Sequence, residues 1–281
     1  MIFKKVVIVG PGLIGGSVGM GLKRLGLAEE VIGVGHRQQS LDKAVALGAI
    51  DRGTLRLEAA APLGDLVLIC TGVESIPQLA ARALPAMKPG SVLSDVGSTK
   101  EEVTRKVEAA MPGRHVAYLG THPLAGLERR GIEAARDDLF RGSLCIFTPT
   151  EHTTADAREL LAQMWQALGA RVRQMAPATH DRLVGDVSHL AHLAAAALVN
   201  AVSDEALELA AAGFRDTTRI ASGDPELWAE IFLSNKDSVA KGLLSLLEQI
   251  GEFAAAFDRH DKEALLRVLR KAKERRDNLA R

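Results

Sequence analysis

Residues 6–17 have the sequence VVIVGPGLIGGS, and this stretch decides the fold. The short apolar run at residues 6–9 predicts a β-strand, and the glycines after it follow the spacing G-x-G-x-x-G at the start of a helical pattern. The first glycine allows a tight turn, the second lets a pyrophosphate approach the backbone, and the third lets helix and strand pack closely. Because the N–H groups of a new helix favour phosphate charge, we predict that a dinucleotide binds here, at Gly10, Gly12, Leu13, Ile14 and Gly15.

The first part of the chain alternates short β-branched runs with helical patterns. We expect strands at residues 6–9, 31–34, 66–70, 91–96, 115–119, 144–147 and 170–175, and helices at 13–25, 40–47, 76–86, 100–110 and 155–168. Such alternation is typical of right-handed β-α-β crossovers, which build a largely parallel sheet with helices on both faces. The predicted fold class is therefore α/β, with a Rossmann-type dinucleotide-binding domain over residues 1–176.

Beyond Pro177 the sequence shows only helical patterns. We expect helices at 180–200, 203–212, 225–234, 237–257 and 262–276, and therefore an all-helical second domain over residues 177–281. The segment 237–257 is too rich in Leu and Ala for an isolated solvated helix. It should pack against the other helices or against a second subunit.

The composition excludes several classes of function. The 281 residues include 35 Lys and Arg against 35 Asp and Glu, and this formal net charge of +0 argues against a nucleic-acid or membrane-surface binder. Two cysteines cannot form a disulfide framework or a thiolate zinc cluster, and we expect no metal site. No run approaches the roughly 18 uninterrupted apolar residues of a membrane span. These features predict a cytoplasmic protein with no membrane partner.

The ribose end of the expected dinucleotide site lacks the usual acidic residue. An NAD-binding domain places Asp or Glu about 20 residues beyond the glycines, and Gly35 occupies that position. Arg37 and Ser40 could instead bind a 2′-phosphate by charge and by a hydrogen bond. We therefore favour NADP over NAD, with Arg37, Ser40 and also Thr71 as cofactor-binding residues.

Three clusters of polar residues indicate a catalytic and substrate-binding site. Ser98 follows the strand at 91–96, and its hydroxyl points toward the ligand site at the carboxyl strand ends, caps the next helix, or does both. His122 follows Gly120-Thr121 and precedes Pro123 at the carboxyl end of another strand. The third cluster is spread through the helical domain: His180 and Asp181, then Ser188 and His192, which share a helix face, then Arg219, which suits an anionic substrate.

Together these motifs resemble the prephenate/arogenate dehydrogenase family of tyrosine biosynthesis. The resemblance covers nearly the whole chain and rests on GPGLIGGS at 10–17, DVGSTK at 95–100, GTHPLAG at 120–126, HD at 180–181, SHLAH at 188–192 and GFRDTTRIA at 213–221. It implies a 6-phosphogluconate-dehydrogenase-like fold, a nicotinamide cofactor on the first domain and a homodimer built by the helical domain. The implied reaction is oxidative decarboxylation of prephenate to 4-hydroxyphenylpyruvate with hydride transfer to NAD(P)+, or of arogenate to tyrosine.

The resemblance also implies roles for individual residues. His122 matches the histidine that accepts the proton of the substrate 4-hydroxyl, a role that requires a neutral imidazole. Ser98 matches the serine that supports this histidine, and Arg219 matches the arginine that anchors a substrate carboxylate. Four further residues are expected at the substrate: His192, His180 and Ser188 in the helical domain, and Glu128 where some relatives have an acidic gate.

The sequence departs from the family pattern in two places. Many relatives have Pro where Ala191 stands, so we expect a helix irregularity to be relaxed here. The segment 37–40 resembles the NADP-using arogenate branch, whereas His192 resembles the prephenate branch, and the two hints point to different substrates.

Two other functions fit the two-part build but not the polar residues of this chain. A β-hydroxyacid or imine reductase of similar build would place a catalytic Lys, Asp or Tyr on the long helix between the domains, where this chain has Ser188 and His192. A non-catalytic nucleotide sensor would not need His122, Ser98 and Arg219 together. Both alternatives are therefore disfavoured.

Overall fold

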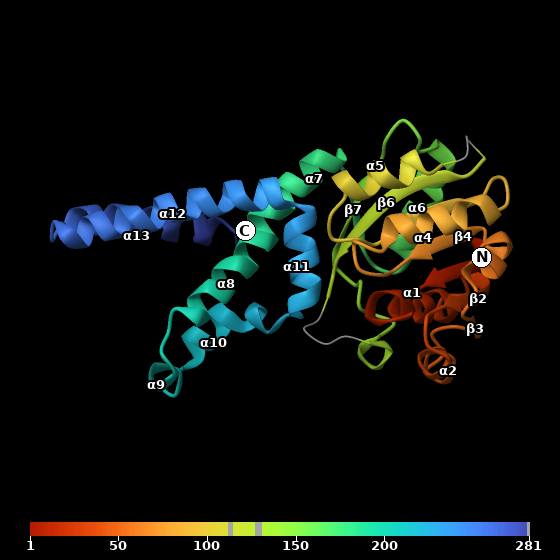
Figure 1. Cartoon of the computed structure of the whole chain (residues 1–281), viewed down its shortest axis with the longest axis horizontal. Helices are drawn as coiled ribbons and strands as arrows, with labels where there is room; N and C mark the ends of the chain where they lie inside the picture. Colours follow the sequence, from red (N-terminus) through yellow and green to blue (C-terminus); the bar gives the residue numbers. More distant parts are fainter. Residues whose placement is uncertain (112–114, 127–130, 280–281) are drawn as a thin grey trace.

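The strand before the glycine-rich turn lies inside an eight-stranded sheet (Figure 1). The computed structural model describes residues 1–111, 115–126 and 131–279. The strand order is β3-β2-β1-β4-β5-β6-β7-β8, and every pairing is parallel except that of β6 with β7. The strands are β1 (Phe3–Val9), β2 (Ala28–Val34), β3 (Arg52–Thr54), β4 (Leu66–Ile69), β5 (Val92–Asp95), β6 (Ala117–Leu124), β7 (Leu144–Thr148) and β8 (Arg171–Gln174).

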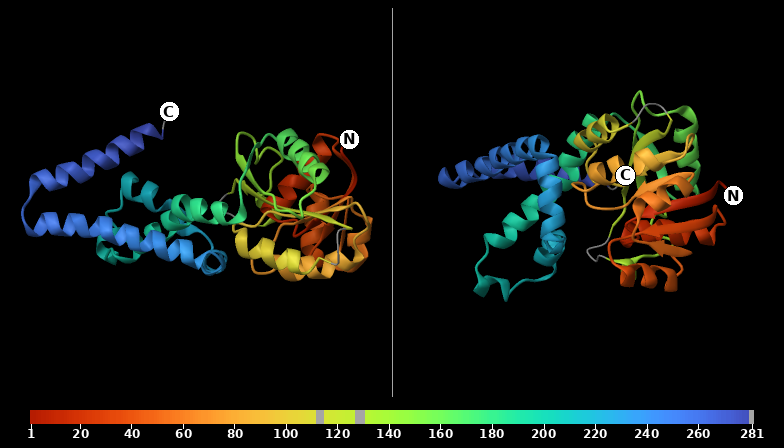
Figure 2. Two further views of the ribbon diagram at one scale, coloured as in Figure 1. Left: turned by 90° about the horizontal axis from the view of Figure 1, so that it is seen from above. Right: turned by 45° about the vertical axis from the view of Figure 1, so that its right-hand side comes forward.

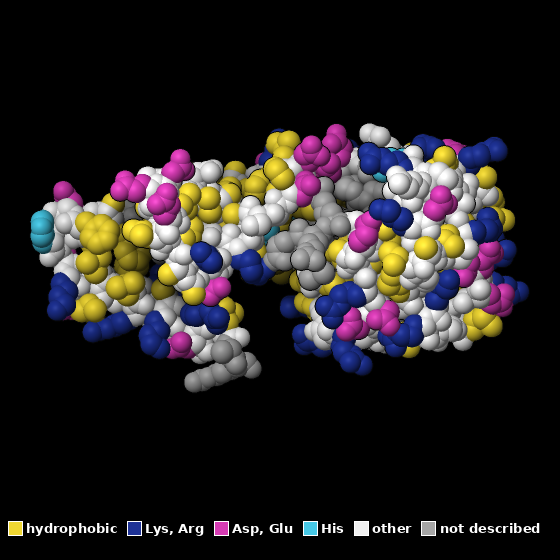
Figure 3. Space-filling model, turned by 90° about the horizontal axis from the view of Figure 1, so that it is seen from below, with side chains coloured by type: hydrophobic (Ala, Val, Ile, Leu, Met, Phe, Trp, Pro, Cys, Tyr) yellow, Lys and Arg dark blue, Asp and Glu magenta, His cyan; other side chains and the backbone are white. Residues whose placement is uncertain are grey.

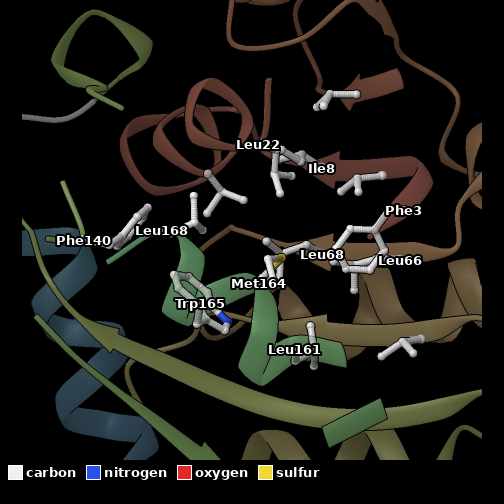
Figure 4. Close-up of a cluster of buried hydrophobic side chains, with 14 of the residues drawn as sticks. Phe3, Ile8, Leu22, Leu66, Leu68, Phe140, Leu161, Met164, Trp165 and Leu168 are labelled. Atoms are coloured by element: carbon white, nitrogen blue, oxygen red, sulfur yellow. The ribbon is translucent and has the colours of Figure 1, made fainter. Parts of the chain in front are cut away.

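Alternation along the strands divides the core between the two faces of the sheet. Val6 and Ile8 of β1 join one buried cluster, whereas Val7 and Val9 join the other, because successive side chains point to opposite faces. Figure 4 shows the first cluster, with Ile8 near Leu22 and side chains such as Trp165 arriving from a helix. This face is covered by α1 (Leu13–Arg24), α2 (Gln38–Ala46) and α6 (Ala155–Ala167), and the other by α3 (Leu57–Ala60), α4 (Ile76–Ala83) and α5 (Glu101–Ala109).

The second part of the chain contains only helices among its described residues. They are α7 (Pro177–Val184), a π-helical turn (Gly185–His189), α8 (Leu190–Asn200), α9 (Asp204–Leu207), α10 (Ala212–Thr218), the 3-10 turn η5 (Arg219–Ser222), α11 (Pro225–Ser234), α12 (Lys236–Asp258) and α13 (Lys262–Asn278). The long helices α12 and α13 contact each other near the turn that joins them, diverge from it and lie away from the sheet (Figure 2). The sheet ends at Gln174 and α7 begins at Pro177; the domain boundary at residue 176 stays a prediction.

Several local expectations need correction. The edge strand β3 and the one-turn helix α3 were not predicted, because three or four residues carry too little periodicity. The helix expected at 203–212 is wrong: Ser203 caps α9, which stops at Leu207, and a separate helix begins at Ala212. Gly213 therefore lies in the first turn of α10 and does not end a helix.

Residues 177–200 form one continuous helical run that contains a π-helical turn. This turn lies at Gly185–His189, where an added Cβ on Gly185 would lie 2.9 Å from the Ser238 Cβ of α12. The expected relaxation near Ala191 is therefore wrong, since the irregularity is present just before it. π-helical turns of this kind occur often at functional sites.

The same run, Pro177–Asn200, is long and apolar enough to cross a membrane by length and composition alone. One such helix is weak evidence, since core helices of other proteins pass the same test. Three of its polar side chains, His180, Asp181 and His189, are buried inside the protein. The absence of a membrane partner stays a prediction.

Candidate active site

The glycine-rich turn leaves no room for side chains at two of its three glycines. Gly10 has a φ of +86°, and a Cβ there would lie 2.8 Å from the Cys70 carbonyl oxygen. A Cβ on Gly15 would lie 2.5 Å from the Gly10 carbonyl oxygen, so the third glycine brings α1 against β1. A Cβ on Gly12 would meet no described atom within 4 Å. The turn is therefore open to a ligand at Gly12.

The first turn of α1 supplies the donors for such a ligand. Gly12 is the N-cap of α1, and its first helical residues are Leu13, Ile14 and Gly15. The N–H groups at a helix start have no partner inside the helix, and no acidic side chain lies in this first turn. These residues fit a pyrophosphate, which needs N–H donors and tolerates no nearby carboxylate.

The other expected cofactor residues follow β4 and β2, the strands on either side of β1. Thr71 follows β4 and lies against the glycine turn, since its Cγ2 is 2.9 Å from the Cβ position of Gly10. Arg37 and Ser40 are exposed at the start of α2. A Cβ on Gly35 would lie 3.1 Å from the Leu41 Cδ2, so an acidic side chain there would crowd α2.

His122 lies within β6, not after the strand as its sequence position suggested. The antiparallel partner β7 extends β6, and His122 pairs there with Ile146. On its other side β6 pairs with β5 only as far as Gly120 with Asp95, so His122 lies beyond the carboxyl end of β5. Ser98 also lies just beyond that end, and the two predicted catalytic residues therefore come from neighbouring strands at one edge of the sheet.

A buried hydrogen-bond chain joins His122 to α7. His122 Nδ1 lies 2.9 Å from His180 Nε2, and His180 Nδ1 lies 2.7 Å from Asp181 Oδ1. Asp181 in turn accepts the backbone N–H groups of Lys100 at 2.7 Å and Glu101 at 2.9 Å, at the start of α5. The side chains of two domains thus meet at the edge of the sheet.

Burial keeps this histidine chain neutral. Burial, followed by the charges of His180 and Lys100, lowers the pKa of His122 well below its ordinary value of 6.5. Burial also lowers the pKa of His180, against the opposite effect of Asp181. His122 therefore has an available lone pair at neutral pH, as a proton acceptor requires.

A buried ion pair lies beneath this edge. Lys100 Nζ contacts Asp95 Oδ1, and both side chains are fully buried. The other Asp95 oxygen accepts the Tyr118 hydroxyl at 2.8 Å, while Oδ1 also accepts the Gly97 N–H at 2.8 Å. These bonds tie the loop that carries Ser98 to the carboxyl end of β5 and to Tyr118 of β6.

The helical part contributes a second polar and aromatic group. His189 is buried in the π-helical turn, with Nδ1 3.1 Å from Asn235 Nδ2, which also donates to the Asp181 carbonyl oxygen at 2.7 Å. The ring of His192 stacks on Trp228, with centroids 3.3 Å apart. Burial lowers the pKa of both His189 and His192 to about 4.

The remaining predicted site residues that the structure describes are half-buried or exposed. Ser98 is half-buried and is not the helix N-cap, which is Lys100; within the described chain its hydroxyl has no hydrogen-bond partner. Ser188 is half-buried in the π-helical turn, and Arg219 is exposed at the start of η5, which packs against α8. Glu128 lies outside the described residues.

Sequence reasoning did not single out Trp228 or Asn235. Trp228 lies on α11 and Asn235 between α11 and α12, far along the chain from His192 and His189, and no motif surrounds them. The one available signal was that Trp228 is one of two tryptophans in the chain. Among the described residues, no group of three or more His, Cys, Asp or Glu side chains could hold a metal ion.

Two family models match the chain and together span most of it. The model for the nucleotide-binding domain of prephenate dehydrogenase matches residues 18–174. The model for the dimerization domain of prephenate dehydrogenase matches residues 176–271.

Individual relatives agree with these models. The prephenate dehydrogenase of Bacillus subtilis is 32% identical over 281 residues, which cover 98% of this chain and 76% of the relative. The structure of Aquifex aeolicus prephenate dehydrogenase in complex with hydroxyphenyl propionate and NAD+ superposes with a TM-score of 0.92 at 32% identity, covering 98% of both chains. Synechocystis arogenate dehydrogenase superposes with a TM-score of 0.83 at 29% identity, covering 98% of this chain and 99% of its own.

Proposed function

Since the chain belongs to the prephenate dehydrogenase family, we propose that it catalyses the oxidative decarboxylation of prephenate to 4-hydroxyphenylpyruvate with NAD(P)+, a step of tyrosine biosynthesis. The observation that carries this proposal is the buried, neutral His122 at the edge of the sheet, hydrogen-bonded to His180. Such a histidine can remove a hydroxyl proton at neutral pH.

The proposed proton transfer uses His122. Its free ring nitrogen accepts the proton of the substrate 4-hydroxyl while the carbinol carbon is oxidised to a carbonyl. The ring carboxylate leaves as CO2, its bonding electrons enter the ring, and the proton returns from His122 to the phenolate oxygen of the product. We assign Ser98, whose hydroxyl has no hydrogen-bond partner among the described residues, a hydrogen bond to the substrate hydroxyl or to the histidine.

Substrate binding is assigned to the helical part. Prephenate carries two carboxylates, and Arg219 can bind one of them by a bidentate interaction. His192 and Ser188 lie on the run between the sheet and η5 and are assigned contacts to the rest of the substrate. Glu128 stays a proposed acidic residue near the entrance.

The cofactor is assigned to the turn formed by Gly10, Gly12 and Gly15, whose open position at Gly12 fits a pyrophosphate. When bound, the nicotinamide accepts the hydride of the carbinol carbon. An NAD+ complex of a relative supports a nicotinamide cofactor. We propose NADP as the preferred form, because Arg37 and Ser40 are exposed at the start of α2 and an acidic ribose ligand is absent at Gly35.

The NADP preference has its own test. Arg37→Ala should lower kcat/KM for NADP by about tenfold or more while leaving that for NAD within about twofold, because only the 2′-phosphate meets the guanidinium. A wild-type enzyme with kcat/KM tenfold higher for NAD than for NADP would show that the preference is wrong.

Arogenate is the second candidate substrate, because the Synechocystis relative is named an arogenate dehydrogenase. Arogenate has an ammonium group in place of the side-chain keto oxygen, and His122 would perform the same proton transfer. Its product would be tyrosine itself. The free thiols of Cys70 and Cys145 support the cytoplasm as the place of this reaction.

Two copies of the chain are proposed to associate through the helical part. The family model that matches residues 176–271 describes a dimerization domain. Figure 3 shows hydrophobic side chains gathered on this part of the surface, and α12 exposes Leu244, Leu247, Ile250 and Phe257. A second copy of this chain would bury that face.

The proposed activity is tested by the absorbance of reduced nicotinamide. The purified protein is mixed with prephenate or arogenate and with NAD+ or NADP+, in all four combinations. Turnover with prephenate supports the proposal, and turnover with arogenate alone favours the second substrate. Absence of turnover in every combination would contradict both proposed substrates. A nucleotide sensor or a reductase would then be the favoured function.

A further inference from the structure

Three side chains from the two parts of the molecule form one buried chain of hydrogen bonds. His122 belongs to β6, whereas His180 and Asp181 belong to α7, and the links between them are 2.9 Å and 2.7 Å long. The side chains of His180 and Asp181 are 0% and 3% exposed. Water therefore does not compete for these bonds, and each donor needs its protein acceptor.

The positions of the protons follow from the acceptor at the Asp181 end. Both oxygens of this carboxylate accept backbone N–H groups of α5, from Lys100 and Glu101. His180 Nδ1 therefore donates its proton to Asp181, which leaves the Nε2 of the neutral His180 ring as an acceptor. His122 Nδ1 then donates to that Nε2, and the lone pair of the His122 ring lies on its own Nε2.

We propose that Asp181 and His180 are positioning residues that hold His122 in the tautomer with the proton on Nδ1 and the lone pair on Nε2. This inference rests on the proposed dehydrogenase function, in which His122 accepts a hydroxyl proton. Only a ring nitrogen without a proton can do so, and the opposite tautomer would present an N–H to the substrate. His180, expected to contact substrate, instead has both ring nitrogens bonded to protein atoms.

The same contacts make the tautomer depend on how the two parts of the chain are docked. Asp181 holds the first turn of α5, which belongs to the sheet part, and Asn235 of the helical part donates to the Asp181 backbone carbonyl. A movement of α7 away from the sheet would separate His180 from His122. The proton acceptor is therefore prepared only while α7 remains packed against β6 and α5.

The tautomer can be measured without any turnover. The full-length, ligand-free protein is labelled with ¹⁵N-histidine, and the ring nitrogens are observed by proton–nitrogen correlation at neutral pH. The chain has eight histidines, so the spectrum of His122→Asn identifies the His122 signals. We expect a protonated Nδ1 and an unprotonated Nε2 on His122. A protonated Nε2 overturns the proposal.

This measurement separates the inference from the proposed function. A protein that oxidises neither prephenate nor arogenate would refute the function, while the spectrum would still decide whether His180 sets the tautomer. A protein that turns over prephenate but carries the proton on Nε2 would refute the inference alone.

Two substitutions at one position test the consequence for catalysis. His180→Leu removes the acceptor for His122 Nδ1, whereas His180→Gln keeps a side-chain oxygen that can accept it. We expect His180→Leu to lower kcat about 100-fold with KM within about threefold, and to give a mixture of His122 tautomers. His180→Gln should retain kcat within about tenfold of the wild type and the wild-type tautomer.

Cofactor binding, followed by fluorescence titration with reduced nicotinamide, serves as the control that both variants are folded. A His180→Leu enzyme with wild-type kcat overturns the proposal, as does a His180→Gln enzyme as slow as His180→Leu. A purely structural role would lower both variants alike. Should His180→Leu fail to fold, the spectrum of the wild-type protein still decides.

Discussion

The sheet part and the helical part bury their apolar side chains to different extents. In the sheet part, two clusters of buried residues cover both faces, and among the described residues Ile231 of α11 is the one buried member from the helical part. Beyond residue 176, the buried apolar side chains of the described chain are Val184, Ala195, Ile231, Val239, Ala256 and Ala264. The sheet part thus has its own core, whereas the helical part needs a second surface to cover its apolar residues. The polar residues of the candidate site lie where the two parts meet.

The largest expected effect comes from removing the proton acceptor at that junction, a change that leaves the packing of both parts intact. His122→Asn should lower kcat by about 100- to 10,000-fold, because the side chain that accepts the hydroxyl proton is lost. Cofactor affinity and molar mass should match the wild type, since neither depends on this side chain. Steady-state kinetics with prephenate measures the effect, and normal turnover would show that His122 is not the proton acceptor.

The second prediction tests whether the exposed face of the helical part is an interface. Leu247→Glu places a charge on α12 and should raise the dimer dissociation constant by about 100-fold or more, since each dimer would bury the charge twice. Sedimentation velocity across a concentration series measures this constant.

The matched control lies on the sheet part. Leu55 is 50% exposed, close to the 53% of Leu247, and Leu55→Glu should leave the association unchanged. Equal dimer dissociation constants for the two variants would show that the interface lies elsewhere. A monomeric wild type would show that this face is not a dimer interface.

The third prediction separates substrate binding on the helical part from proton transfer on the sheet. Arg219→Gln should raise KM for prephenate by about 10- to 100-fold with kcat within about threefold, because a charge-assisted hydrogen bond to a carboxylate is lost. Arg215→Gln, an exposed arginine of α10, is the control. If kcat falls as far as KM rises, Arg219 also acts in the transition state.

The smallest expected effect concerns stability against pH. Burial lowers the pKa of His189 to about 4, whereas in the unfolded chain this group titrates near 6.5. Below pH 6.5 the unfolded state binds the proton and the folded state does not, so stability is lost as the pH falls towards 4. The loss for this one histidine is at most about 1.4 kcal/mol per pH unit.

Urea unfolding at pH 7 and pH 5 measures this loss. The buried His122 and His180 and the half-buried His192 act in the same direction, because their pKa values are also lowered. His189→Gln should flatten the dependence, and His36→Gln, at an exposed position, is the control. An unfolding free energy that is equal at both pH values would contradict burial of these rings as neutral groups.

Much of the sheet part could be predicted from local sequence. The β-branched runs and the glycines at 10, 12 and 15 indicate β1, the turn and α1, because strand period and turn chemistry are local properties. The expected parallel order fails where β6 pairs with β7: both β7 and β8 run opposite to the other strands, and this direction depends on partner strands and not on their own residues. That reversal is also why His122 lies inside a strand.

The helical part was harder to predict. The predicted helix 203–212 stopped before Gly213, yet Gly213 lies in the first turn of α10. Ala191 suggested a regular helix, yet a π-helical turn is present at Gly185–His189. A close approach of α12 to Gly185 accompanies that turn, and such packing between distant segments leaves no trace in local periodicity. For the same reason Trp228 and Asn235 were not recognised as neighbours of His192 and His189.

By itself the sequence determined the family, the α/β fold with its helical second part, and the candidate residues His122, His180 and Arg219, because each is carried by a motif with its own chemistry. The tertiary structure decided how they are used. It placed His180 between His122 and Asp181 and left Arg219 exposed on the helical part. The physical reason is that a hydrogen bond depends on distance and direction, and residues 58 positions apart in sequence meet only when β6 and α7 pack together.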